Sequence, residues 1–202
     1  MKKSKIKIMA IDPGLTNTGW VTMDYSLGNG DLVVTKIGEF HPGPAADKAE
    51  HREDTEKFSK RTISLKLLWD ELRSILLAEQ PDYIAVEDIF FNPQRPSAHA
   101  ALAMYHGIAR MVCMQILNKP IECIPTKIAK QEMTGSGGNG KLSVQQAILT
   151  CKTLGFKNKQ VESQVDEHCA DAIAVGYAFA RRNRERILMD HGNPLQLNKE
   201  AK

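Results

Sequence analysis

The chain has 202 residues, of which 42% are hydrophobic and 25% charged, so length and composition predict one globular domain, with or without a tail. No stretch reaches the roughly 18–20 consecutive apolar residues of a membrane span, and we expect no membrane partner. The net charge is +3, and Lys and Arg gather at residues 2–7, 57–66, 119–141 and 181–186. Such patches suit a polyanionic ligand, although an ordinary solvated surface is the more frequent explanation for any single patch.

The cysteines and the N-terminus favour a cytoplasmic location. The four cysteines form no CxxC pair and show no zinc-site spacing, so we interpret them as reduced thiols. The apolar run near the N-terminus is interrupted by Lys5, Lys7 and Asp12, which makes it too short and too charged for a signal peptide.

In chain order, the first part of the sequence predicts an antiparallel meander. Apolar and polar residues alternate through a run rich in β-branched side chains, and Asn29-Gly30 is a hairpin signal, so we expect strands at residues 5–12, 18–24 and 31–40. Residues 41–58 are polar and charged, and we interpret them as a loop or mobile segment whose role we cannot assign.

The remainder predicts alternating strands and helices. We expect helices at residues 59–79, 97–117, 126–133, 142–155 and 167–182, and buried strands at 83–87 and 121–124. Residues 1–183 would form the domain and 184–202 a partly disordered tail. The order predicts an α/β fold with a mixed five-stranded sheet, whose first three strands are antiparallel and the rest parallel, and with helices on both faces.

Three carboxylates stand at positions that suggest chemistry. Asp12 ends an apolar strand before Pro13-Gly14, Glu87 ends the most buried-looking strand, and Asp171 lies among small residues on a helix. Ligands bind at strand ends in α/β sheets, and ionised carboxylates are rarely buried without a cation. The structural alternatives are a turn-forming Asp and a Glu at the exposed end of its strand.

His168 precedes Asp171 by three residues, so both side chains share one helix face, although packing at the helix start explains a lone His as well. Carboxylates on separate elements suit Mg²⁺ or Mn²⁺ and can hold two ions. One ion lowers the pKa of an attacking water, and the other stabilises the leaving oxygen of a phosphodiester.

Three segments resemble the motifs of RuvC-type Holliday-junction resolvases, which have the RNase H-like fold. Residues 11–19 (IDPGLTNTG) are similar to the first motif, 81–90 (PDYIAVEDIF) to the second, and 168–174 (HCADAIA) to the last. Residues 127–141 also resemble the family's basic helix and glycine loop, so the likeness spans about residues 6–181. The first motif alone is shared with actin-like ATPases, but the ordered set is more specific.

The resemblance implies an endonuclease that depends on Mg²⁺ or Mn²⁺, with two ions per site. Such an enzyme acts as a homodimer and nicks two opposed strands of a four-way DNA junction, leaving 5′ phosphates. Asp12, Glu87 and Asp171 match the metal-binding carboxylates of the family. His168 falls where many members have a fourth carboxylate and some have His, so it would ligate a metal or shuttle a proton.

The resemblance also implies residues that contact DNA. Phe90 matches an aromatic position near the junction centre, where Phe91 could substitute for it; core packing is the alternative for one of the two. The matching basic positions are Lys127, Lys130 and Lys141, and the apolar helix 97–117 would form the dimer contact.

Three other functions remain open from the sequence. An RNase H-like nuclease could act on RNA, an RNA–DNA hybrid or simple duplex DNA. An actin-like ATPase normally needs two such domains, for which 202 residues are too few. A junction-binding protein without activity is disfavoured, because buried carboxylates that hold no metal only destabilise a fold.

Overall fold

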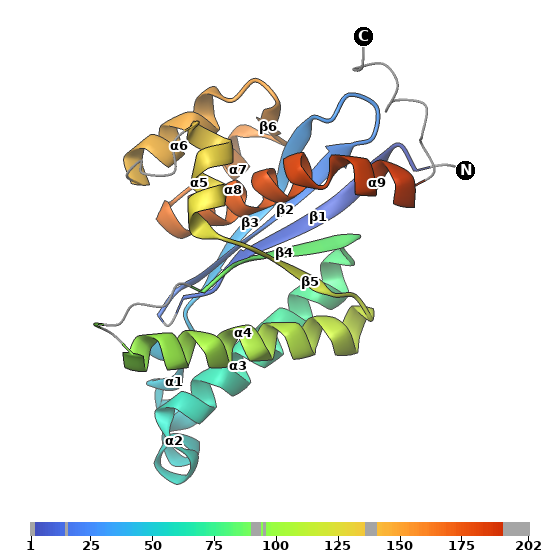
Figure 1. Ribbon diagram of the computed structural model, residues 1–202. Helices are drawn as coiled ribbons and strands as arrows, with labels where there is room; N and C mark the ends of the chain where they lie inside the picture. Colours follow the sequence, from blue (N-terminus) through green and yellow to red (C-terminus); the bar gives the residue numbers. More distant parts are fainter. Residues whose placement is uncertain (1–2, 15, 90–93, 95, 136–140, 192–202) are drawn as a thin grey trace.

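The structure is a computed structural model that describes residues 3–14, 16–89, 94, 96–135 and 141–191. Within these residues, six strands pair into one mixed sheet (Figure 1). The strands are β1 (Lys5–Asp12), β2 (Thr18–Ser26), β3 (Leu32–Phe40), β4 (Tyr83–Glu87), β5 (Ile121–Ile124) and β6 (Leu154–Phe156). Their order across the sheet is β5-β4-β1-β2-β3-β6. The opening meander is antiparallel, whereas β4 pairs parallel to β1, β5 to β4 and β6 to β3.

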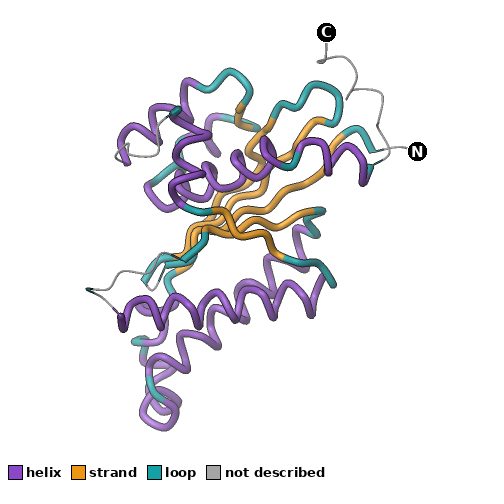
Figure 2. Tube along the Cα trace, viewed as in Figure 1, coloured by secondary structure: helices purple, strands orange, loops and turns teal. Residues whose placement is uncertain are grey.

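The helices form a layer on each face of this sheet (Figure 2). One layer contains α1 (Pro42–Ala46), the 3₁₀ turn η1 (Ala49–His51), α2 (Arg52–Phe58), α3 (Lys60–Glu79) and α4 (Pro96–Leu117). The other contains α5 (Thr126–Thr134), α6 (Lys141–Thr150), α7 (Lys159–Glu162), α8 (Glu167–Arg182) and α9 (Arg184–Asp190). The predicted mixed α/β fold is therefore confirmed.

Each layer has its own hydrophobic core against the sheet. The inward side chains of α3 and α4 pack on one face, with Met9, Ile11, Ile84 and Val86 of β1 and β4 beneath them. On the other face, α8 is buried along almost its whole length, because its small residues bring its backbone close to the strands. A Cβ at Gly176 would lie 1.8 Å from Met23 Cε, so α8 packs directly on β2.

The structure differs from the sequence prediction in three segments. The sheet has a sixth strand, β6, where we expected the end of a helix; α6 stops at Thr150 instead. Residues 41–58 form α1, η1 and α2 rather than a loop, and α1 and α2 pack against α3. The expected tail begins with the helix α9, whose Ile187 and Leu188 are buried; residues 192–202 lie outside the described part of the chain.

Helix α4 also departs from the expectation that no stretch resembles a membrane span. By length and composition alone, His99–Leu117 is long and apolar enough to cross a membrane, with a mean hydropathy of 1.3. This is weak evidence, because a core helix of a globular domain passes the same test. One face of α4 packs against α3 and the sheet, and 33% of this stretch is buried.

Candidate active site

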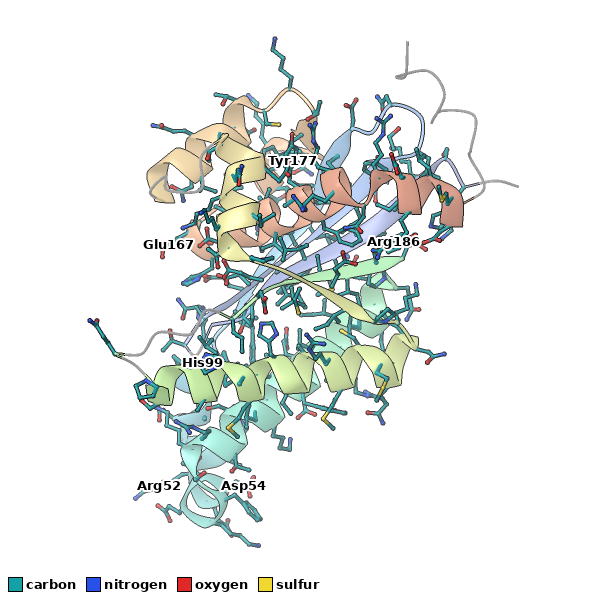
Figure 3. All side chains as sticks on the ribbon, viewed as in Figure 1. Arg52, Asp54, His99, Glu167, Tyr177 and Arg186 are labelled. Carbon is teal, nitrogen blue, oxygen red and sulfur yellow. The ribbon has the colours of Figure 1, made fainter. Side chains whose placement is uncertain are left out.

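Asp12 and Glu87 end neighbouring parallel strands. Ile11 of β1 pairs with Val86 of β4, so the two acids follow this pair side by side at the same edge of the sheet. Asp12 is only 8% exposed. The two carboxyl groups are hydrogen-bonded to each other, which requires one proton between them. In Figure 3, the labelled His99 of α4 and Glu167 of α8 mark this end of the sheet.

The environment of Glu87 favours its protonated form when no cation is present. Burial, together with the hydrogen bond and charge of Asp12, raises the pKa of Glu87 to about 8. The Thr126 hydroxyl, which donates to the Glu87 carboxylate, and the positive charge of Lys130 act in the opposite direction. Two acids that share a proton in a buried place form a site where a metal ion can replace that proton.

His168 joins this pair from the start of α8. Its Nδ1 lies 3.2 Å from Asp12 Oδ2, and its Nε2 lies 3.2 Å from the side-chain nitrogen of Asn17. An ionised Asp12 has no proton to donate, so Nδ1–H is the donor, and the Asn17 amide donates to the lone pair on Nε2. In the neutral form of the ring, this arrangement therefore places the proton on Nδ1.

A glycine allows α8 to reach the site. Gly19 of β2 pairs with Asp12 of β1, and a Cβ at Gly19 would lie 2.7 Å from the backbone carbonyl of His168. Gly14 instead forms a tight turn, where a Cβ would lie 1.9 Å from Asn17 O.

The hydrogen bonds continue outward from His168. Asn17 Oδ1 accepts from His41 Nδ1 at 2.9 Å, and His41 Nε2 lies 3.4 Å from Glu39 Oε2. His41 precedes α1, so the segment that we could not assign from sequence starts beside the site. Asp166 caps α8 by accepting from Cys169 N at 2.8 Å.

A second histidine supports Glu87 from the opposite layer. His106 of α4 is 5% exposed, and its Nε2 donates to the backbone carbonyl of Glu87 at 2.7 Å. Burial lowers the pKa of His106. The sequence prediction gave no role in the site to His106, Asn17, His41 or the Thr126 hydroxyl, because the partner of a lone polar side chain is known only once the fold places the two together.

Asp171 lies one helical turn beyond His168, on the same face of α8, and is partly exposed. Among the described residues, no three His, Cys, Asp or Glu side chains converge closely enough to hold a metal ion as they stand. The donor set nevertheless fits a hard divalent cation, because Asp12 and Glu87 are adjacent oxygen donors that share a proton in its absence.

The predicted DNA-contacting residues are only partly visible. Lys127 and Lys130 lie on α5; Lys127 is exposed, whereas Lys130 is half-buried and near Glu87. Lys141 begins α6, but its side chain is outside the described part of the structure, as are Phe90 and Phe91.

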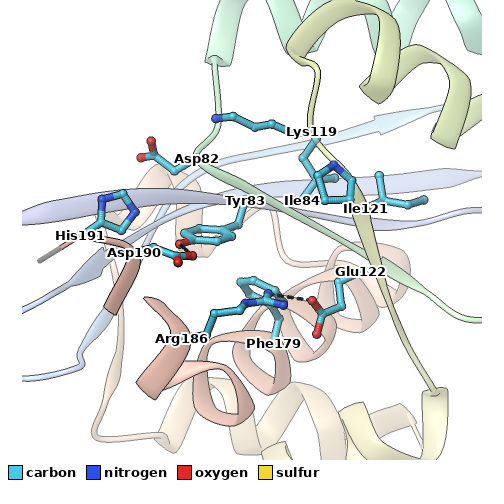
Figure 4. Close-up of a pocket in the computed structure, with 11 residues that line it drawn as sticks. Asp82, Tyr83, Ile84, Lys119, Ile121, Glu122, Phe179, Arg186, Asp190 and His191 are labelled. Atoms are coloured by element: carbon cyan, nitrogen blue, oxygen red, sulfur yellow. Dashed lines mark hydrogen bonds and ion pairs between the residues drawn. The ribbon is translucent and has the colours of Figure 1, made fainter. Parts of the chain in front are cut away.

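A separate pocket of about 480 Å³ lies at the other end of β4 (Figure 4). Arg186 of α9 lines this pocket, and its guanidinium lies 2.7 Å from Glu122 Oε2. The same guanidinium lies over the rings of Tyr83 and Phe179. Tyr83 in turn donates to Asp190 at 2.7 Å. These four polar side chains pair with one another, and none of them belongs to the candidate active site.

Comparisons with known proteins agree on one family. A family model described as "Crossover junction endodeoxyribonuclease RuvC" matches residues 49–188. A protein with this description from Carboxydothermus hydrogenoformans is 30% identical, over 86% of this chain and 94% of its own length. Another from Caldicellulosiruptor saccharolyticus is 27% identical, over 84% of this chain and 89% of its own length. A solved structure of T. thermophilus RuvC in complex with a Holliday junction substrate matches with a TM-score of 0.69 and 20% identity, covering 90% of this chain and 96% of that one.

Proposed function

The chain belongs to the RuvC family of crossover junction endodeoxyribonucleases, and from this membership we propose that it resolves four-way or branched DNA junctions by paired nicks that leave 5′ phosphates. The observation that carries the proposal is the pair of carboxyl groups at adjacent strand ends, buried Asp12 and partly buried Glu87, with His168 beside them. The relatives named above are bacterial, and we place this protein in the cytoplasm, where their DNA is.

Nucleases of this family depend on divalent metals, and we propose that Asp12, Glu87, Asp171 and His168 hold Mg²⁺ or Mn²⁺, with two ions per site. When bound, the ions lower the pKa of the attacking water and stabilise charge on the leaving oxygen. Without them the carboxylates would repel a phosphodiester, so the metal requirement extends to binding at the scissile phosphate.

The side chains of this chain divide the remaining work. Thr126 and Lys130 favour the ionised form of Glu87, the form that can bind a cation. Asp12 accepts the Nδ1 proton of His168, and this contact directs the Nε2 lone pair of the ring toward Asn17. Once the Asn17 amide is displaced, this lone pair can ligate a cation or accept a proton.

The proposed substrate contacts lie outside the carboxylate pair. Lys127, Lys130 and Lys141 would neutralise phosphates, which sets affinity and salt dependence rather than sequence preference. Phe90 or Phe91 would contact unstacked bases at the junction centre. A homodimer that contacts its partner through α4 would place two sites on one junction.

The substrate is tested with labelled DNA and RNA. The protein is incubated with a four-way junction, a linear duplex and an RNA–DNA hybrid, each with Mg²⁺, with Mn²⁺ and with a chelator. We expect paired symmetric nicks in the junction only, and only with metal. Cleavage of the hybrid or the duplex at a comparable rate would favour an RNase H-like nuclease with another substrate.

The site is tested with isosteric variants. We expect Asp12→Asn, Glu87→Gln and Asp171→Asn to abolish cleavage while junction binding survives, because each removes a charged ligand without changing the fold. Asp70→Asn, on the exposed surface of α3 where Asp70 pairs with Lys66, is the matched control and should cleave normally. Retained cleavage in any of the first three variants would remove that residue from the site.

A further inference from the structure

The contact between His106 and Glu87 joins one layer of helices to the active-site end of the sheet. His106 projects from the inner face of α4, and a carbonyl oxygen can only accept, so the ring nitrogen Nε2 carries the proton in this 2.7 Å hydrogen bond. His106 is only 5% exposed, and burying a polar ring costs folding free energy unless its hydrogen bonds are made.

This bond acts at the point where β4 ends. The next peptide N–H, of Asp88, donates to Ile124 O of β5 at 2.9 Å, so the peptide group between Glu87 and Asp88 is held on both sides. The Glu87 carboxylate is in turn held by the Thr126 hydroxyl at the start of α5. Three elements thus restrain one residue, and α4 contributes through His106.

We propose that His106 is a positioning residue, which fixes the direction of the Glu87 carboxylate by holding the backbone carbonyl of Glu87. The inference rests on the proposed function, because it needs Glu87 to be a catalytic metal ligand. Without the donor, the peptide is held only through the Asp88 N–H, so the carbonyl can tilt, and the side chain that leaves the same Cα moves with it.

The geometry of the donor provides a matched pair of variants. In His106→Gln, the amide nitrogen can take the place of Nε2, whereas in His106→Asn the shorter side chain reaches only the place of Nδ1. Both side chains are polar and uncharged, so they differ mainly in whether a donor reaches the Glu87 carbonyl. His106→Leu removes the donor and keeps an apolar side chain of similar reach.

We expect His106→Leu and His106→Asn to lower kcat on the order of 10- to 100-fold, with junction affinity near that of the wild type, and His106→Gln to recover most of that loss. Binding of Mn²⁺ to the protein without DNA, measured by electron paramagnetic resonance, should weaken about tenfold in Leu and Asn but not in Gln. Thermal unfolding shows whether each variant is folded. If His106→Leu does not fold, the comparison of Gln with Asn decides.

Two results would overturn the positioning role. One is cleavage and Mn²⁺ binding by His106→Leu equal to those of the wild type. The other is equal activity of the Gln and Asn variants, which would mean that any polar side chain suffices. Glu87→Gln, measured in parallel, separates a failure of the proposed active site from a failure of the positioning role of His106. If Glu87→Gln still cleaves, the proposed site itself is wrong; if it is inactive while His106→Leu is normal, only the role of His106 fails.

Discussion

Glu87 combines two opposing requirements in one side chain. It ends a buried strand beside Asp12, and these two surroundings raise its pKa to about 8, yet it must be ionised to bind a cation. Thr126 and Lys130 lower the energetic cost of the ionised form but do not cancel it. A metal ion is the remaining partner that can compensate two adjacent carboxylates, so occupancy of the site and the charge of Glu87 should be linked.

This linkage predicts how stability depends on pH. Because the pKa of Glu87 is raised in the folded protein, its contribution to the free energy of unfolding is fully present below the ordinary value of 4.5 and is lost as pH rises to about 8. We therefore expect the metal-free protein to lose stability across this range, and added Mg²⁺ or Mn²⁺ to raise the melting temperature most near pH 8. Thermal unfolding with and without a chelator measures both effects. A Glu87→Gln variant with an unchanged pH dependence would contradict this assignment.

Lys130 has a role at the same scale. It lies near Glu87 and on the helix that we expect to face the DNA backbone. Lys130→Ala should weaken junction binding and reduce the slope of log affinity against log salt by about one. Binding titrations at several salt concentrations measure this slope. Lys66→Ala, on α3 and paired with Asp70, is the control that should leave it unchanged.

At the scale of elements, the site depends on how closely α8 approaches the sheet. Gly176 contacts Met23 of β2 and Ala10 of β1, and Gly19 of β2 makes room for the backbone of His168. These glycines bring the helix that carries His168 and Asp171 against the strand that carries Asp12. Small residues therefore set the distance between the candidate metal ligands on separate elements.

Adding a methyl group at this contact should separate the layers. A Cβ at Gly176 would lie 1.8 Å from Met23 Cε and 3.0 Å from Ala10 Cβ, so we expect Gly176→Ala to destabilise the protein by about 1–3 kcal/mol and to reduce cleavage. Denaturant unfolding measures the change in stability. Gly155→Ala is the control, because a Cβ at Gly155 has nothing within 4 Å. Equal stability of the two variants would show that α8 has room to shift.

At the scale of the whole molecule, α4 has two different faces. Its inner face packs on α3 and the sheet and carries His106, whereas its outer face exposes Met104, Met111 and Met114 by 43%, 53% and 63%. Exposed apolar side chains in one stripe are costly in water and favour contact with another surface. In this molecule, the proposed dimer helix is also the helix that contacts the backbone of Glu87.

Charges in this stripe should separate the dimer. We expect the double variant Met111→Lys and Met114→Lys to halve the mass measured by light scattering and to abolish paired nicking, because the apolar contact would be replaced by like charges. Leu149→Lys, which alters an exposed apolar residue of α6, is the matched control. A wild-type protein that is monomeric at all concentrations would contradict the dimer.

The sequence by itself determined the mixed sheet, its two layers of helices and the candidate residues Asp12, Glu87, His168 and Asp171. The spacing of apolar residues and the position of a residue at a strand end are local properties of the sequence, and the order of the motifs can be seen in the sequence alone. Tertiary structure decided the rest. The short strand β6 and the helices of residues 41–58 are stabilised by partners distant in sequence, such as β3 and α3, rather than by local pattern.

For the same reason, the sequence predicted the candidate ligands but not the residues that hold them in place. Thr126, Asn17 and His106 are ordinary polar residues in the sequence, and each gains a role only where the fold places a donor against Glu87 or His168. A hydrogen bond between residues on different layers depends on distances of a few tenths of an ångström, which no spacing along the chain encodes. The sequence therefore identified the candidate metal ligands, and the packing of α4, α5 and α8 decided how these side chains are held.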